Sequence, residues 1–82
     1  MNYKRGDFVA THSGFYVMII KEPTNSDNSI IYVGCDLTSI FFTQRGWFSR
    51  RATKEEKSRL IWLLSKKGYT WDEENLELTQ EL

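Results

Sequence analysis

The chain has 82 residues, of which 40% are hydrophobic and 15% aromatic, with eleven basic and eleven acidic side chains. This length suits one small domain over residues 1–82 and excludes a protein with separate substrate and cofactor domains. The zero net charge argues against binding of a polyanion through bulk charge alone.

The cysteine content and the N-terminus both bear on where the protein works. The single cysteine, Cys35, cannot form an internal disulfide, whereas small secreted domains usually carry several. The first residues lack the apolar stretch of a signal peptide. The longest apolar run, residues 15–20, is far shorter than the ~20 residues that span a bilayer. We therefore expect a cytoplasmic protein with no membrane partner.

The first half of the chain predicts short strands separated by turns. Residues 15–20 are all apolar, and all but Met18 are β-branched or aromatic, which is typical of a strand covered on both faces. The only proline lies in a polar loop over residues 23–29, and Gly34 indicates a bulge or a close backbone approach. The predicted strands are residues 8–11, 15–20, 30–35, 40–43 and, after a turn at 44–46, a fifth at 47–49.

A helix is predicted over residues 53–67, where the hydrophobic period changes. Thr53 and Glu56 have the spacing of a capping box, in which each side chain binds the other residue's backbone N–H. Gly68 provides a C-terminal stop. The leucines at helical spacing, which form the predicted buried face, are Leu60, Leu63 and Leu64.

After the helix the hydrophobic period falls to two. Tyr69 and Trp71 alternate before a polar turn at 72–75, and Leu76 and Leu78 alternate after it, which predicts a hairpin over residues 69–79. The whole pattern predicts an α+β domain. It comprises a small curved antiparallel sheet of four to five strands (in the β-rich part, 1–51), one amphipathic helix and a C-terminal β-hairpin (in the part 52–82).

Charge is unevenly spread along the chain. Residues 43–67 carry eight basic and two acidic side chains, while residues 68–82 carry five acidic side chains and no basic one. Two interpretations stay open. Either the acidic tail folds back and neutralises the basic stretch, or the basic stretch is available to a partner.

The residues that could support catalysis are few. His12, the only histidine, lies beside Ser13 in a tight loop, and a base must meet its nucleophile across space with a third group to orient it. Cys35 lies in a strand pattern on the same face as Ile31 and Val33, so we interpret it as a small buried hydrophobe. We expect no enzymatic activity, no catalytic residue, no metal site and no cofactor.

A stretch that mixes basic and aromatic residues follows the fourth predicted strand. Single-stranded nucleic acid is bound by such pairs, with guanidinium on phosphate and bases stacked on rings. The alternative is that Trp47 and Phe48 fill the gap between sheet and helix and leave the arginines solvated. The candidate nucleic-acid-binding residues are Arg45, Trp47, Arg50, Arg51 and Lys54.

The helix is apolar on more than one face. Leucines alone supply a buried face, so Ile61 and Trp62 need another explanation. We expect the C-terminal hairpin to cover this second side. The alternative is an exposed protein-binding patch of Ile61 and Trp62, for a partner or for a second copy of the chain.

Two segments resemble known sequences. The pattern Ala-Thr-x-Glu-Glu-Lys at residues 52–57, followed by Gly-Tyr-x-Trp-Asp at 68–72, is similar to short uncharacterised gut-bacterial and phage-derived proteins. The opening Lys-Arg-Gly-Asp-Phe-Val at residues 4–9 resembles the first strand of SH3-like small barrels. Together these resemblances imply a phage or mobile-element accessory protein with an SH3-like barrel of four to five strands before a helix–hairpin unit.

Function is predicted less sharply than fold. The apolar excess on the helix and the few catalytic candidates favour a non-catalytic interaction module that binds a protein partner or self-associates as a homodimer. The alternative is weak binding of single-stranded nucleic acid through the basic and aromatic stretch.

Overall fold

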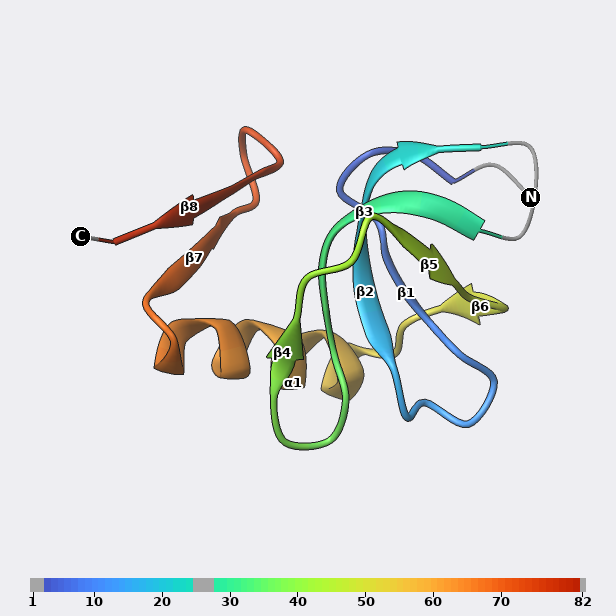
Figure 1. The fold of residues 1–82 in the computed structure, drawn as a ribbon, viewed down its shortest axis with the longest axis horizontal. Helices are drawn as coiled ribbons and strands as arrows, with labels where there is room; N and C mark the ends of the chain where they lie inside the picture. Colours follow the sequence, from blue (N-terminus) through green and yellow to red (C-terminus); the bar gives the residue numbers. More distant parts are fainter. Residues whose placement is uncertain (1–2, 25–27, 82) are drawn as a thin grey trace.

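The computed structural model describes residues 3–24 and 28–81 as an α+β fold with one helix, one larger antiparallel sheet and a separate hairpin (Figure 1). The fold class is as predicted, and the sheet is curved and open rather than a closed barrel. It has six strands instead of four to five. The elements are β1 (Phe8–Ala10), β2 (Val17–Pro23), β3 (Asn28–Cys35), β4 (Ile40–Phe41), β5 (Arg45–Trp47), β6 (Arg50–Arg51), α1 (Lys54–Lys66), β7 (Tyr69–Asp72) and β8 (Glu77–Gln80).

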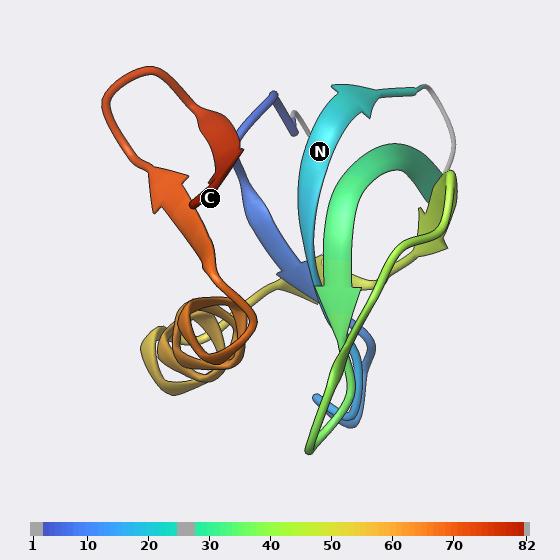
Figure 2. The same cartoon turned by 60° about the vertical axis from the view of Figure 1, so that its left-hand side comes forward.

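The six-stranded sheet has the strand order β4-β3-β2-β1-β6, and β5 also pairs with β3. Strand β3 is long enough to accept two partners, β5 at its start and β4 at its end. Figure 2 shows β2 and β3 arching strongly, which makes the sheet curved rather than flat. Strands β4 and β5 are short, and they pair with opposite ends of β3. Residues of both strands line the groove that is described below.

Two register shifts interrupt the pairing of β2 with β3, and the first of them affects which core cluster the residues of β3 join. Ile19 pairs with Val33, but the next residue, Ile20, pairs with Ile31, so Tyr32 is an extra residue in β3. As a result Val33 packs with the helix leucines, while Ile31 packs on the opposite face. The prediction that Ile31 and Val33 share the face of Cys35 is therefore wrong for Ile31.

The helix covers one face of the sheet, as its leucines predicted. Leu60 and Leu64 are fully buried and Leu63 nearly so, in a cluster with Val17, Ile19 and Cys35 of the sheet. The capping box is present, because Thr53 Oγ1 accepts from the Glu56 N–H and a Glu56 carboxylate oxygen accepts from the Thr53 N–H. Gly68 has φ 83°, the left-handed conformation of a helix stop.

The hairpin packs on the helix and sheet through Trp71. This side chain is buried and meets the Phe8 ring edge-on, with 5.8 Å between ring centroids. The Tyr32 hydroxyl donates to the Leu76 carbonyl oxygen at 3.0 Å, which ties the hairpin turn to β3. The predicted hairpin over 69–79 is confirmed by β7 and β8.

Three local predictions differ from the structure. Strand β2 begins at Val17, which leaves Phe15 and Tyr16 about 40% exposed in the preceding loop instead of covered on both faces. The predicted turn at 44–46 is largely strand β5. The predicted loop over 23–29 is shorter, because β2 continues to Pro23 and β3 starts at Asn28; residues 25–27 lie outside the described residues.

Candidate binding groove

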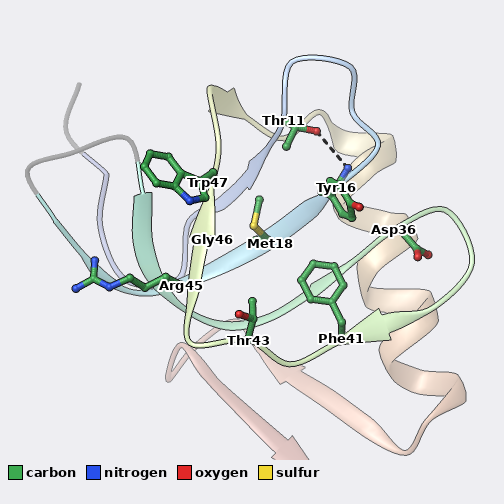
Figure 3. A pocket seen from close by; sticks show the side chains of 9 residues that line it. All are labelled: Thr11, Tyr16, Met18, Asp36, Phe41, Thr43, Arg45, Gly46 and Trp47. Carbon is green, nitrogen blue, oxygen red and sulfur yellow. Dashed lines mark hydrogen bonds between the residues drawn. The ribbon is translucent and has the colours of Figure 1, made fainter.

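An aromatic groove of about 600 Å³ opens on the sheet face opposite the helix (Figure 3). Trp47 stands on one side of it, and Tyr16 and Phe41 stand on the other, with Met18 between them at the base. Asp36, Arg45 and two threonines contribute the polar groups. The full lining is Thr11, Tyr16, Met18, Asp36, Phe41, Thr43, Arg45, Gly46 and Trp47.

At the base of the groove, two glycines let side chains approach the backbone closely. A Cβ at Gly46 would collide with the Met18 sulfur, and a Cβ at Gly34 would lie 2.6 Å from the Phe41 ring. The prediction of a bulge or a close backbone approach at Gly34 is therefore wrong, because Gly34 pairs regularly with Met18 and it is side chains, of Phe41 and Met18, that approach it. Met18 is 2% exposed, so the base of the groove is continuous with the second core cluster.

The wall that carries Tyr16 is a loop held by charged side chains of the helix. Arg59 Nη2 donates to the carbonyl oxygens of Gly14 and Phe15, at 2.8 and 3.1 Å. Arg50 forms two hydrogen bonds with the Glu56 carboxylate, at 2.8 and 3.0 Å, and a third with the His12 carbonyl oxygen at 3.3 Å. The loop is therefore held by two side chains, Arg50 of β6 and Arg59 of α1, and Glu56 orients the first of them.

This network also changes the acidity of its carboxylate. The Arg50 guanidinium, together with the Thr53 N–H, lowers the pKa of Glu56 from 4.5 to about 2. Gly14 has φ 80°, and a Cβ there would collide with the Glu56 carboxylate. The left-handed conformation predicted at Gly14 is confirmed, and the packing leaves no space for a side chain.

The five predicted nucleic-acid-binding residues do not form one surface. Arg45 and Trp47 line the groove, and Trp47 is 63% exposed rather than filling a gap. Arg50 is paired with Glu56, and Arg51 with Asp7 at 2.8 Å. Lys54 is exposed at the start of the helix, and Phe48, not Trp47, is buried in the second cluster.

The hairpin does not cover the second side of the helix, so that prediction is wrong. Trp62 remains 58% exposed and Ile61 37% exposed, because Trp71 packs against the leucine face instead. The Lys66 ammonium lies 4.5 Å from the centre of the Trp62 ring, one turn along the same helix. Neither residue lines any of the three cavities described among residues 3–24 and 28–81.

The remaining sequence candidates lie apart from the groove. His12 is exposed in its turn, and Cys35 is fully buried, where desolvation raises the pKa of its thiol. Within residues 3–24 and 28–81, no group of three or more His, Cys, Asp or Glu side chains is placed to hold a metal ion. In the part of the chain that the structure describes, an ion pair between Lys57 and Glu73, at 2.7 Å, joins the basic stretch to the acidic tail.

Sequence reasoning missed most of the groove. The sequence pattern predicts Tyr16, Met18 and Phe41 only as strand residues, and Asp36 only as part of a break between strands. The available signal was the pair of adjacent aromatics at 15–16, which begins an apolar run directly after a glycine turn. Two large rings next to a loop indicate a partly exposed surface rather than a strand that is covered on both faces.

Comparisons with known proteins leave the resemblances noted above as predictions. No protein-family model, curated protein or solved structure matches the chain. Among the described residues, the single helix α1 is too short and too polar to cross a membrane.

Proposed function

We propose that this protein is a non-catalytic interaction module that holds an extended segment of a partner protein in the aromatic groove. The observation that carries the proposal is the exposure of Trp47 and Tyr16 beside a buried methionine base. Rigid aromatic side chains at the centre of an apolar hollow are the residues that dominate binding energy in protein interfaces. Their supports, strand β5 and the loop clamped by Arg50 and Arg59, keep the groove open without a ligand.

The charge around the groove favours a protein segment over nucleic acid. A nucleic-acid strand needs a row of free cations along its phosphates. Arg50 and Arg51 are engaged by Glu56 and Asp7. Among the described residues that line the groove, Arg45 is the only basic one.

Peptide selection tests the proposal. A displayed library of random 12-residue peptides is selected on the wild-type protein alone, and the affinities of the enriched peptides for wild type and Trp47→Ala are then measured by calorimetry. We expect micromolar binding that weakens at least about 30-fold in Trp47→Ala, the loss typical of a central aromatic anchor. Trp62→Ala, an equally exposed tryptophan on the helix, is the matched control and retains full affinity. Peptides that bind wild type and Trp47→Ala alike would overturn the proposal.

A further inference from the structure

Strand β5 is paired along one of its two edges. It runs antiparallel to the start of β3, and no other described strand pairs with it. All three residues of β5 line the groove and no residue of β3 does, so the groove follows the edge of β5 that faces away from β3. Figure 3 shows Met18, Tyr16 and Phe41 on one side of the β5 ribbon. The groove is therefore bordered by a sheet edge that is open to a further strand.

The register of β5 decides which of its main-chain groups face the groove. The Ile31 N–H donates to the Gln44 carbonyl oxygen at 3.2 Å, so these residues form a hydrogen-bonded pair directly before β5. Bonded and non-bonded pairs alternate along an antiparallel ladder. Gly46 is therefore bonded to β3, whereas the N–H and C=O groups of Arg45 and Trp47 point away from β3. Among the described residues, none hydrogen-bonds to these four groups.

Free main-chain groups at every second residue select an extended polypeptide as the occupant. A helix uses its N–H and C=O groups for its own internal bonds. An extended segment instead presents N–H and C=O groups at every second residue, with the same repeat as β5. An unpaired edge of this kind is a template for pairing with another chain.

The two faces of β5 set the side chains that such a segment can carry. A Cβ at Gly46 would collide with the Met18 sulfur, so this residue faces the core. Residues directly opposite each other in a sheet share a face. A partner residue opposite Gly46 would therefore direct its side chain to the Met18 side, where an apolar residue fits. The two flanking residues would lie beside Arg45 and Trp47 on the exposed face.

We propose that the partner segment binds as an added antiparallel strand of the sheet, paired with β5 through the main chain of Arg45 and Trp47; this inference rests on the proposed function. The central residue of the segment is apolar and lies on the Met18 side. Neither flanking residue is proline, because proline has no N–H to donate. Main-chain hydrogen bonds supply the affinity of strand addition, and alternate side chains supply its specificity.

Amide hydrogen exchange, followed by NMR on the isotope-labelled full chain, tests the open edge. In the free protein we expect the N–H groups of Arg45 and Trp47 to exchange faster than that of Gly46, which is the internal control. Saturation with the tightest-binding 12-residue peptide selected on wild type should slow the first two at least about tenfold. Slow exchange of both in the free protein would overturn the proposal. Protection that rises with protein concentration alone would assign the edge to a second copy, and would overturn a separate partner.

A pair of substitutions separates the main chain of β5 from its side chain. Arg45→Pro removes the outward N–H, whereas Arg45→Ala removes only the guanidinium and keeps that donor. Proline is tolerated on an edge strand where its nitrogen faces outward. We expect the selected peptide to bind Arg45→Pro about tenfold more weakly than Arg45→Ala, the scale of one hydrogen bond left unmade. Equal affinities of a folded Arg45→Pro and Arg45→Ala would overturn the proposal.

An N-methyl scan of the selected peptide gives the same information on the wild-type protein, even if Arg45→Pro does not fold. Methylation of one peptide N–H at a time should weaken binding at alternate residues, because only every second N–H faces β5. Trp47-dependent binding with no such alternation and no amide protection would overturn the added strand and leave the interaction module in place. Failure to select any Trp47-dependent peptide would overturn both proposals.

Discussion

Two tryptophans are exposed to a similar degree, and their surroundings differ. Trp47 faces two other rings across a groove whose base is part of the core, and it stands on a strand paired with β3. Trp62 lies on the outer face of the helix, covered in part by Lys66 of the same helix. An exposed aromatic residue becomes a candidate site where other elements build a concave surface around it. A large exposed ring alone does not suffice.

The helix α1 connects the two regions, because Arg59 of the helix holds the groove loop and Trp62 lies on the same helix. The inner and lateral side chains of α1 hold the sheet and the groove loop, while its outer side chains hold nothing that the structure describes. Substitutions that separate these roles test the comparison directly.

The largest effect is expected from a pair of substitutions on opposite faces of the helix. Leu60→Ala removes a fully buried side chain and should lower the free energy of unfolding by about 2–5 kcal/mol. Trp62→Ala should lower it by less than about 1 kcal/mol, the scale of an exposed cation–π contact. Urea denaturation followed by circular dichroism measures both. A loss of several kcal/mol in Trp62→Ala would show that the outer face is part of an interface, as in a homodimer.

A smaller effect is expected from acid, through the carboxylate that holds the groove loop. The pKa of Glu56 is about 2 in the folded chain and 4.5 as its ordinary value, so its stabilisation is complete above pH 4.5 and is lost as the pH falls toward 2. Allowing for solvent screening, the stabilisation is about 1–2 kcal/mol. Thermal unfolding of wild type and Glu56→Gln should differ at pH 7 and converge near pH 2.

The control for the acid experiment is Glu55→Gln, which changes the exposed neighbouring carboxylate. Its stability difference from wild type should be small across the same pH range. A Glu56→Gln variant that is as stable as wild type at pH 7 would show that the Arg50–Glu56 pair does not hold the loop.

The smallest effect concerns the paired arginines. Arg50→Ala with Arg51→Ala should leave the weak binding of a single-stranded oligonucleotide at low salt nearly unchanged, because both guanidinium groups are engaged within the fold. Arg45→Ala is the comparison variant, since its cation lies in the groove lining. Fluorescence anisotropy measures the affinity of a labelled oligothymidine for wild type, the double variant and Arg45→Ala. Strong, salt-sensitive binding that is lost in the double variant would favour nucleic acid as the partner.

The helix and hairpin could be predicted because their signals are local. The Thr53–Glu56 capping box and the Gly68 stop lie within one segment, and both appear as expected. The leucine face also followed from spacing alone, because a helix has one repeating geometry.

The groove could not be predicted in the same way. It joins Tyr16, Phe41 and Trp47, which come together only because β3 pairs with β4 and β5 at its two ends. Which arginines are free depends on Asp7 and Glu56, and the Arg51–Asp7 pair joins residues 44 positions apart. Sequence spacing identified Arg45 and Trp47 as candidates, but not the wall opposite them.

The extra residue Tyr32 gives the chain one strand that serves two interiors. Ahead of it, Ile31 belongs to the layer beneath the groove; after it, Val33 belongs to the layer beneath the helix. Deleting Tyr32 would make Ile31 the direct neighbour of Val33, and direct neighbours in a strand face opposite sides, so each side chain would keep its layer. The extra residue therefore acts through its own side chain, which ties the hairpin turn to β3, and a Tyr32 deletion should loosen the hairpin while it leaves the groove layer in place.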